Sequence, residues 1–227
     1  MSDRPLPGDR PAAPDPAPAS PEAAEALRQR RAWVFSWLAG VFAAPPDVAA
    51  VAAYRRGAAA LILGELAADP ALGHGALAMS VALDAPLDDD ALTARLGIAF
   101  GRLFLGIGGP DTVAPYESAH RCGGRLYGAP VSEMTALLAA HDLSVAEGLH
   151  EPADHLSVEL DLMARLVATD HPDRSGLAAR LAAWVPDFGR LCVARDASGF
   201  WAGAAEILLA HLGDETRRLA CSPTSIN

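Results

Sequence analysis

The sequence predicts an all-α protein, a helical bundle of about eight to ten helices in two halves joined by a long central loop. Alanine and leucine dominate the 227 residues, whereas the β-branched and aromatic residues that strands favour are sparse. Apolar side chains also recur at helical spacing over several long segments. Prolines and capping side chains stand where several of those segments begin.

Four helices are expected in the first half, residues 21–110. Ser20 offers a capping side chain and Pro21 a favourable first-turn residue, so the first helix is predicted to begin there. Two consecutive prolines at positions 45 and 46 end it. The expected helical segments of this half are 21–44, 47–66, 70–83 and 88–105.

The second half, residues 129–219, is expected to follow a long loop at 106–128 in which no apolar period is clear. Loops of that length are uncommon inside compact domains and are usually functional or mobile. As a linker between the halves, it is compatible with a monomer or with a domain-swapped dimer. The expected helices of this half begin at Pro130 and Pro152 and then cover about 174–184, 186–196 and 199–219.

A single helical domain, residues 21–219, is expected between two tails. Residues 1–20 contain six prolines among alanines and aspartates, too little apolar surface to offset the entropy of ordering, so a disordered tail is predicted. Residues 220–227 form the second tail. No apolar run approaches the roughly 18 residues of a membrane helix, and no secretory signal is recognisable. A cytoplasmic protein without stable membrane insertion is therefore expected.

The charge of the chain excludes several classes of function. The formal net charge is −10, and every basic residue is arginine. An acidic surface repels nucleic acid and attracts cationic partners, so we expect no nucleic-acid role. The absence of lysine excludes Schiff-base chemistry and a phosphate-binding P-loop. The three cysteines lie far apart and form no CxxC metal or redox motif.

The segment EPADHLSVEL, residues 151–160, concentrates ionisable side chains that suit a metal site, an acid/base pair or a protein-holding face. Pro152 fits the first position of a helix, which places Asp154 in its first turn. His155 and Glu159 then lie on one face at i, i+4 spacing and supply only two metal ligands, where a stable site wants three or four. No other segment offers a second well-spaced pair of histidines or cysteines.

A catalytic interpretation of this segment also lacks a nucleophile, because Ser118 does not stand in a G-x-S-x-G turn. We therefore expect no enzyme, no catalytic residue, no metal and no cofactor. Two alternatives remain open at this point. In the first, the segment has a purely structural role: Asp154 caps its helix and His155 hydrogen-bonds a loop. In the second, His155 and Glu159 bind the metal ion of a small helical hydrolase.

Four segments together carry a resemblance to a known family. They are FGRLFLGIGGP (100–110), APYESAH (114–120), EPADHLSVEL (151–160) and WVPDF (184–188), the last followed by a helix with Phe200 and Trp201. The chain resembles the TorD/DmsD family of redox-enzyme maturation chaperones, which also includes the NarJ-type nitrate reductase chaperones. The resemblance covers roughly residues 27–213, and the E-P-x-D-H-L motif after P-Y-E-S is its most specific part.

The resemblance implies an all-helical cytoplasmic chaperone without catalysis. Family members bind the twin-arginine signal peptide and the apo form of a molybdopterin oxidoreductase of the dimethyl sulfoxide or trimethylamine N-oxide reductase class. They hold that client until its cofactor is inserted and export proceeds. A structural subunit of a reductase complex remains the alternative among binding proteins, and permanent co-purification with the enzyme would distinguish it.

The family's motif residues line a groove between the two halves, and the resemblance carries that role to matching positions here. The client-binding candidates are Leu103, Phe104, Pro115, Tyr116, Glu117, Ser118, Glu151, Pro152, Asp154, His155 and Glu159. The chemistry agrees, because a leader with two arginines and an apolar stretch needs carboxylates beside an apolar surface. The four acidic candidates supply the carboxylates. The apolar surface comes from Leu103, Phe104, Tyr116 and Leu156.

Overall fold

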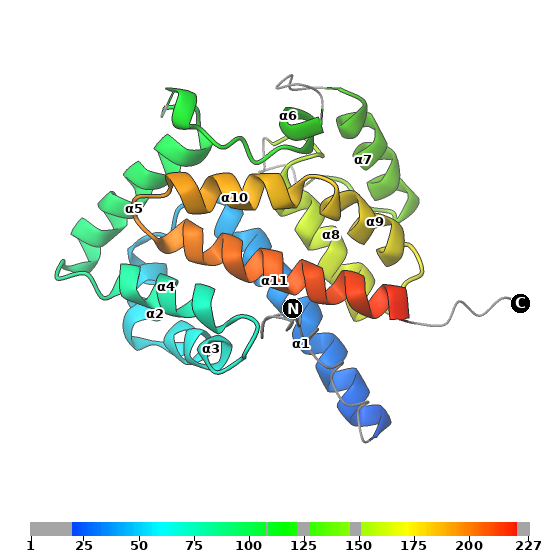
Figure 1. The fold of residues 1–227 in the computed structure, drawn as a ribbon, viewed down its shortest axis with the longest axis horizontal. Coiled ribbons are helices and arrows are strands. Elements are labelled where there is room, and N and C mark those ends of the chain that lie inside the picture. Colours follow the sequence, from blue (N-terminus) through cyan, green and yellow to red (C-terminus); the bar gives the residue numbers. More distant parts are fainter. Residues whose placement is uncertain (1–19, 108, 122–127, 146–150, 222–227) are drawn as a thin grey trace, which may run out of the picture.

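A computed structural model describes residues 20–107, 109–121, 128–145 and 151–221 (Figure 1). Within these ranges the protein is built from α-helices and one short 3-10 helix, η1, so the all-α prediction is confirmed. The expected tail at 1–20 lies almost entirely outside the described residues, and so does most of the tail at 220–227. The elements are α1 (Pro21–Ala43), α2 (Val48–Arg56), α3 (Ala58–Ala67), α4 (Gly73–Leu83), α5 (Asp89–Phe104), η1 (Gly109–Asp111), α6 (Glu117–Arg121), α7 (Ala129–Ala140), α8 (Leu156–Ala168), α9 (Arg174–Ala182), α10 (Val185–Arg195) and α11 (Phe200–Cys221).

The helices share one core, to which both ends of the sequence contribute. In Figure 1, α2 to α5 occupy the left of the molecule, α6 to α9 the right, and α10 and α11 cross the middle. The most extensive helix contacts join α1 to α8 and α4 to α11. Aromatic rings pack edge-on or stacked at the centre, and this aromatic cluster consists of Phe42, Phe100, Phe104, Phe188 and Trp201.

The single helix expected over 47–66 is wrong, because the chain breaks at Gly57. This residue is extended, with φ −107° and ψ −159°, and separates α2 from α3. A Cβ atom at Gly57 would lie 3.0 Å from the Cα of Ala53, a close contact that disfavours a side chain at this turn. The break also turns Leu61, expected on the buried stripe, out to solvent, where its side chain is 73% exposed.

Two further boundaries differ from the expectation. The segment 106–128 is expected to be loop, but its described part contains η1 and α6. The helix expected from Pro152 begins only at Leu156, so Asp154 lies before the helix instead of in its first turn. Residues 153–155 instead form a connection that pairs with the segment preceding α6.

A pair of glycines brings α4 and α11 into backbone contact. A Cβ atom at Gly203 would lie 2.5 Å from the carbonyl oxygen of Gly75 and 2.9 Å from the backbone nitrogen of Met79. A Cβ atom at Gly75 would meet the carbonyl of Gly203 at 2.4 Å. The two helices therefore pack at a distance that any side chain at either position would increase.

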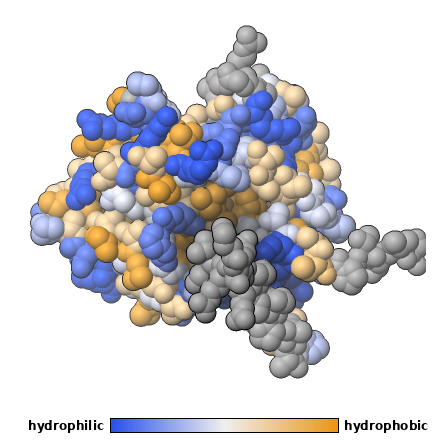
Figure 2. Space-filling model, in the orientation of Figure 1, coloured by the Kyte–Doolittle hydropathy of each residue, from blue (hydrophilic) through white to orange (hydrophobic). Residues whose placement is uncertain are grey.

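No helix among the described residues is both long enough and apolar enough to cross a membrane. Hydrophobic and hydrophilic residues are interleaved over the described part of the face shown in Figure 2. The larger apolar side chains that remain exposed are scattered over several helices.

Candidate functional site

The two motif segments of the sequence meet in the fold. Tyr116 and His155 face each other as an isolated antiparallel β-bridge. The backbone N–H of Glu117 donates to the carbonyl of Asp154 at 3.0 Å, and that of Leu156 donates to the carbonyl of Pro115 at 2.8 Å. These backbone bonds join the start of α6 to the start of α8, and we call this place the motif junction.

Asp154 caps α6 and not α8. Its side chain is fully buried, and its Oδ2 atom accepts the backbone N–H of Ser118 at 3.0 Å. A carboxylate at this place satisfies an N–H group that the first turn of α6 leaves without a helical partner. The capping role considered from the sequence is thus real, but it acts on a helix 36 residues earlier in the chain.

His155 supplies the cap of α8 itself. Its Nδ1 accepts the backbone N–H of Ser157 at 3.1 Å and lies 2.7 Å from the hydroxyl of the same residue. Burial lowers the pKa of His155, opposed by the nearby carboxylates of Glu151 and Asp154. A neutral ring with a lone pair on Nδ1 is the form that these hydrogen bonds require.

Two acidic side chains beneath the junction, Glu117 and Glu159, are fully buried. Arg180 on α9 forms an ion pair with Glu117, and its Nε lies 3.8 Å from Oε1 of Glu159. The indole N–H of Trp184 donates to Oε2 of Glu159 at 3.2 Å. Burial and the neighbouring carboxylate of Glu117 raise the pKa of Glu159 well above its ordinary value. The guanidinium of Arg180 thus faces two acids, and Glu117 also pairs with Arg121.

The structure therefore divides the eleven candidate residues into three groups. Tyr116, Glu151 and Pro152 are partly exposed, and the hydroxyl of Tyr116 donates to Oε2 of Glu151 at 2.6 Å. The junction residues that are buried are Pro115, Glu117, Ser118, Asp154, His155 and Glu159.

Leu103 and Phe104 form the third group, and they lie away from the junction. Both are buried, and Phe104 belongs to the aromatic cluster. Its ring stacks on Phe188, which packs edge-on against Trp184, the donor to Glu159. A continuous line of aromatic contacts therefore connects the two places.

Sequence reasoning missed Arg180 and Trp184, the two residues that complete the junction. Arg180 also donates to the carbonyl of Pro130 at 2.8 Å and pairs with Glu133 at 2.9 Å, so it ties α7 to the same network. A signal was present, since two acids on buried helix faces require a cationic or hydrogen-bonding partner. The sequence alone did not show which of the arginines fills that role.

A groove of about 300 Å³ lies next to the junction, between α1, the end of α7 and α8. Its walls are mainly apolar, and they include Ala39, Ala43, Leu143, Val145, Val158 and Leu162. Ser157, the partner of His155, also lines this groove, and Asp161 contributes a carboxylate. Asp161 is half exposed and pairs with Arg165 at 3.0 Å. The groove combines apolar walls with one ion pair, because Arg165 lines it together with Asp161.

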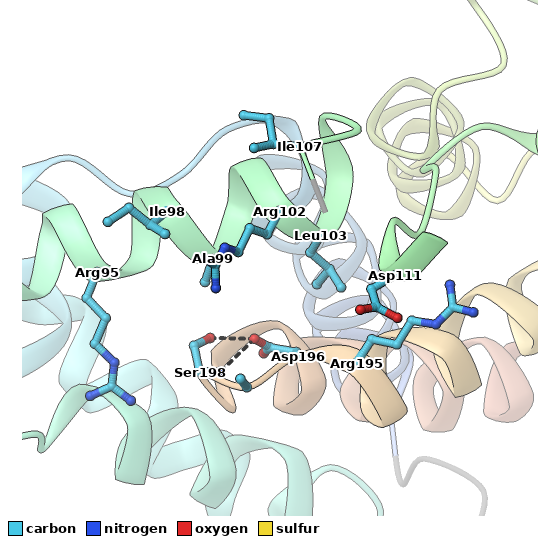
Figure 3. A pocket seen from close by; sticks show the side chains of 11 residues that line it. Arg95, Ile98, Ala99, Arg102, Leu103, Ile107, Asp111, Arg195, Asp196 and Ser198 are labelled. Carbon is cyan, nitrogen blue, oxygen red and sulfur yellow. Dashed lines mark hydrogen bonds between the residues drawn. The ribbon is translucent and has the colours of Figure 1, made fainter. Parts of the chain in front are cut away.

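A larger hollow of about 560 Å³ has the opposite charge (Figure 3). Arg95 and Arg102 reach it from α5, and Arg195 reaches it from the end of α10. Asp196 on its floor accepts hydrogen bonds from the backbone N–H and the hydroxyl of Ser198, and these bonds stabilise the turn before α11. The lining holds three arginines against two aspartates, Asp111 and Asp196, so its net positive charge disfavours a cationic peptide.

Comparison with known proteins identifies the family. Residues 67–190, more than half of the chain, match the family model described as "Nitrate reductase delta subunit". The chain is 30% identical over 199 residues to the chaperone protein TorD of Vibrio cholerae, an alignment that covers 82% of this chain and 90% of that protein. The chain belongs to the TorD/NarJ-like family of maturation chaperones.

Further TorD/NarJ-like relatives support the same assignment. TorD of Aliivibrio salmonicida is 26% identical over 209 residues, covering 86% of this chain and 97% of that protein. A crystal structure of a redox enzyme maturation protein from Archaeoglobus fulgidus shares the fold, with a TM-score of 0.51, 20% identity, and coverage of 79% of this chain and 92% of that chain. The TorD relatives are named chaperones, not enzymes, in agreement with the non-catalytic expectation.

The raised pKa of Glu159 leads to a pH prediction. Its pKa is raised in the folded protein, so folding takes up a proton and stability falls as pH rises from the unfolded pKa toward the folded one. Substitution Glu159→Gln keeps a neutral acceptor for Trp184 and removes this titration. The variant is expected to lose less stability with rising pH, by up to about 1.4 kcal/mol per pH unit in that window. Urea unfolding at several pH values measures the difference, and parallel curves for the two proteins would contradict it.

Proposed function

We propose that this protein is a cytoplasmic chaperone that holds the apo form of a molybdopterin oxidoreductase, and its twin-arginine leader, until the cofactor is inserted. Membership of the TorD/NarJ-like family over most of the chain is the observation that carries the chaperone role. The dimethyl sulfoxide or trimethylamine N-oxide reductase class is the client class we favour. Nothing in this role requires a catalytic residue, a metal or a cofactor.

We assign the leader to the apolar groove between α1 and α8. A twin-arginine leader places two guanidinium groups before an apolar stretch, so its binder needs an apolar channel with carboxylates at one end. The groove has apolar walls and the half-exposed carboxylate of Asp161, which a leader arginine would share with or take over from Arg165. The three arginines of the larger hollow make that alternative electrostatically unfavourable. The net charge of −10 steers a cationic leader toward the protein.

The motif residues have two roles in this proposal. The buried acids and His155 hold the starts of α6 and α8 in place, and through Ser157 they shape one wall of the groove. Tyr116 and Glu151 are partly exposed and carry the accessible acidic group of the motif. We therefore propose Glu151 as a contact for leader arginines and the buried motif residues as positioning groups.

Calorimetric titration with a synthetic twin-arginine leader of a molybdoenzyme tests the proposal. Binding is expected for this leader and is expected to be lost for the matching twin-alanine peptide. Asp161→Asn removes one charge-assisted contact and should weaken binding by about tenfold. Asp214→Asn is the matched control, because Asp214 pairs with Arg218 at i, i+4 spacing on α11, as Asp161 does with Arg165.

Three results would contradict parts of this assignment. Equal affinity for the twin-arginine and twin-alanine peptides would show that the arginine pair is not recognised. An unchanged affinity of the Asp161→Asn variant would contradict the assignment of the leader to the groove between α1 and α8. Permanent co-purification with the mature, cofactor-loaded reductase would favour a structural subunit over a chaperone that leaves its client.

A further inference from the structure

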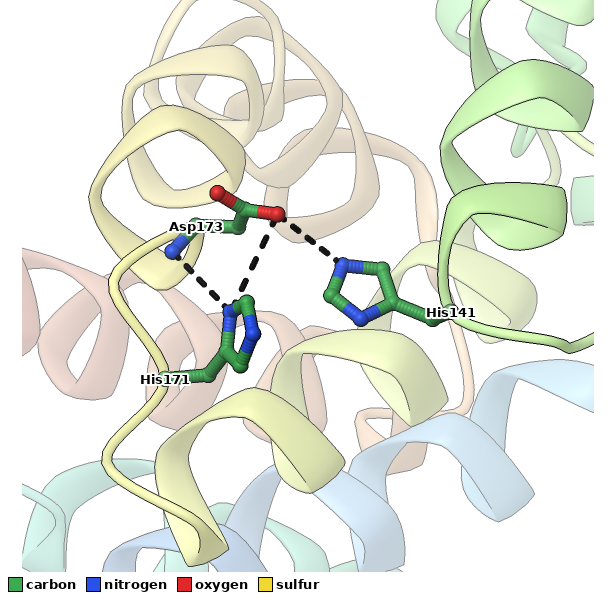
Figure 4. Close-up of side chains that lie close together, drawn as sticks. All are labelled: His141, His171 and Asp173. Carbon is green, nitrogen blue, oxygen red and sulfur yellow. Dashed lines mark hydrogen bonds and ion pairs between the residues drawn. The ribbon is translucent and has the colours of Figure 1, made fainter.

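Two histidines and an aspartate far from the motif junction converge on one point. His141 ends α7, His171 lies in the connection between α8 and α9, and Asp173 stands at the start of α9 (Figure 4). One ligand atom from each side chain lies within 4.8 Å of the other two. The sequence showed no such pairing, because the two histidines are separated by 30 positions and form no local motif.

The backbone holds these side chains on rigid helix ends. Asp142 follows α7 with φ 55°, and the N–H of Leu143 donates back to the carbonyl of Leu138 at 3.0 Å. Asp170 follows α8 with φ 53°, and the N–H of His171 donates back to the carbonyl of Leu166 at 2.9 Å. Both are left-handed helix terminations of the Schellman type. The two imidazoles are therefore placed by regular structure, which favours a defined site over a chance encounter.

The distances suit a tetrahedral metal ion. Nε2 of His141 lies 3.2 Å from Oδ2 of Asp173, and Nδ1 of His171 lies 3.8 Å from the same oxygen. Ligands about 2.0–2.1 Å from a tetrahedral zinc ion stand roughly 3.3–3.5 Å apart. The ligand atoms lie within 4.8 Å of one another, so the side chains must rotate toward a common centre to bind the ion. Two imidazoles and a carboxylate are ligands that Zn²⁺ accepts, and three such groups leave a fourth position for water.

Hydrogen bonding and exposure set the conditions under which an ion could enter the site. Nδ1 of His171 accepts the backbone N–H of Asp173 at 3.2 Å, and a metal ion bound at this nitrogen would replace that hydrogen bond. Metal binding requires neutral imidazole and ionised carboxylate. His141 is mostly covered, with 14% of its side chain exposed, whereas His171 and Asp173 are exposed enough to admit an ion from solvent.

We propose that His141, His171 and Asp173 form a Zn²⁺ site that joins the end of α7 to the connection between α8 and α9. This departs from the sequence-based expectation that no metal is bound. α7 buries only Pro130, Met134 and Leu138, and Arg180 already ties its first turns to α9. Zinc supplies the matching tie at the opposite end of the helix. Because Leu138 and Leu143 line the groove beside α8, the ion also stabilises one wall of that groove.

Competition with a chromophoric zinc chelator at pH 7.5 tests the proposal on the full chain. We expect one Zn²⁺ per chain, and we expect His171→Ala and Asp173→Asn each to weaken affinity by about tenfold or more, since even outer partners of a metal site contribute that much. His171 and Asp173 are well exposed, so both variants should keep the helical circular dichroism of the parent. His74→Ala is the matched control, because His74 pairs with Glu206 at 2.6 Å without belonging to the three-residue cluster.

Hydrogen exchange supplies an independent readout. Zinc is expected to slow amide exchange in the last turn of α7 in the parent and in His74→Ala, and to have no such effect in His171→Ala. Binding that survives both cluster substitutions, or that falls equally in His74→Ala, would overturn the site. Failure here leaves the leader-binding proposal untouched, because the calorimetric test of the leader contains no metal.

Discussion

Replacement of Arg180 by alanine is expected to destabilise the folded protein by about 3 kcal/mol, because it leaves the buried carboxylate of Glu117 with only the partly exposed Arg121 as a counter-charge. Glu117 is fully buried and pairs directly with the guanidinium, which also approaches Glu159. The same substitution removes the hydrogen bond to the carbonyl of Pro130 and the ion pair with Glu133. Chemical unfolding followed by circular dichroism measures the loss.

Two further variants separate the charge effect from a general sensitivity to arginine removal. Arg190→Ala on the neighbouring helix removes an exposed pair with Asp187 and should cost no more than about 0.5 kcal/mol. The double variant Arg180→Met with Glu117→Gln removes both charges and keeps side-chain volume, so it should recover part of the loss. A double variant less stable than Arg180→Ala would show that packing, and not the unpaired charge, dominates.

Gly203→Ala is expected to destabilise the protein by about 3 kcal/mol, at the upper end of the usual cost of overpacking. The added methyl group meets the carbonyl oxygen of Gly75 at 2.5 Å and the backbone of Met79 at 2.9 Å. Backbone atoms cannot rotate away as a side chain does, so α4 and α11 must separate along their contact. Thermal unfolding of the variant measures the cost.

The same helix provides the control. Gly213→Ala places its methyl group 3.5 Å from the mobile guanidinium of Arg217, an ordinary contact. It should raise stability by up to about 1 kcal/mol, because alanine favours a helix over glycine. If Gly213→Ala lowered stability as much as Gly203→Ala, α11 would be sensitive to substitution in general. The close approach of α4 would then not explain the loss at Gly203.

Where apolar spacing and a local cap coincide, the sequence predicted the helices well. α1 begins after the cap at Ser20, and α5 begins after the cap at Asp88, each with a side-chain hydrogen bond three residues ahead. The stripe from Leu156 to Val167 on α8 is buried as expected. In each case neighbouring residues determine the element, so local sequence contains the necessary information.

The features that sequence reasoning missed depend on residues far apart in the chain. α6 has five residues, too few to be stable alone, and it exists because Asp154 caps it from another segment. From the sequence, the motif acids are expected to bind a client's arginines, whereas in the structure Arg180 already lies among them. Asp154 lies before α8 because the two motif segments pair through their backbones, and neither segment alone has a sequence pattern that predicts this pairing.

The place of α11 in the chain affects how the protein is made. Among the described helices it is the last in sequence, yet it packs against α4 and α1 from the first half as well as against α9 and α10. While a ribosome is still synthesising the chain, the surfaces of α1 and α4 that α11 will cover remain open to water. Folding dominated by contacts so distant in sequence is delayed until those partners exist. The helices made first must therefore wait for the last one, and a nascent chain of this protein itself presents exposed apolar surface until synthesis reaches α11.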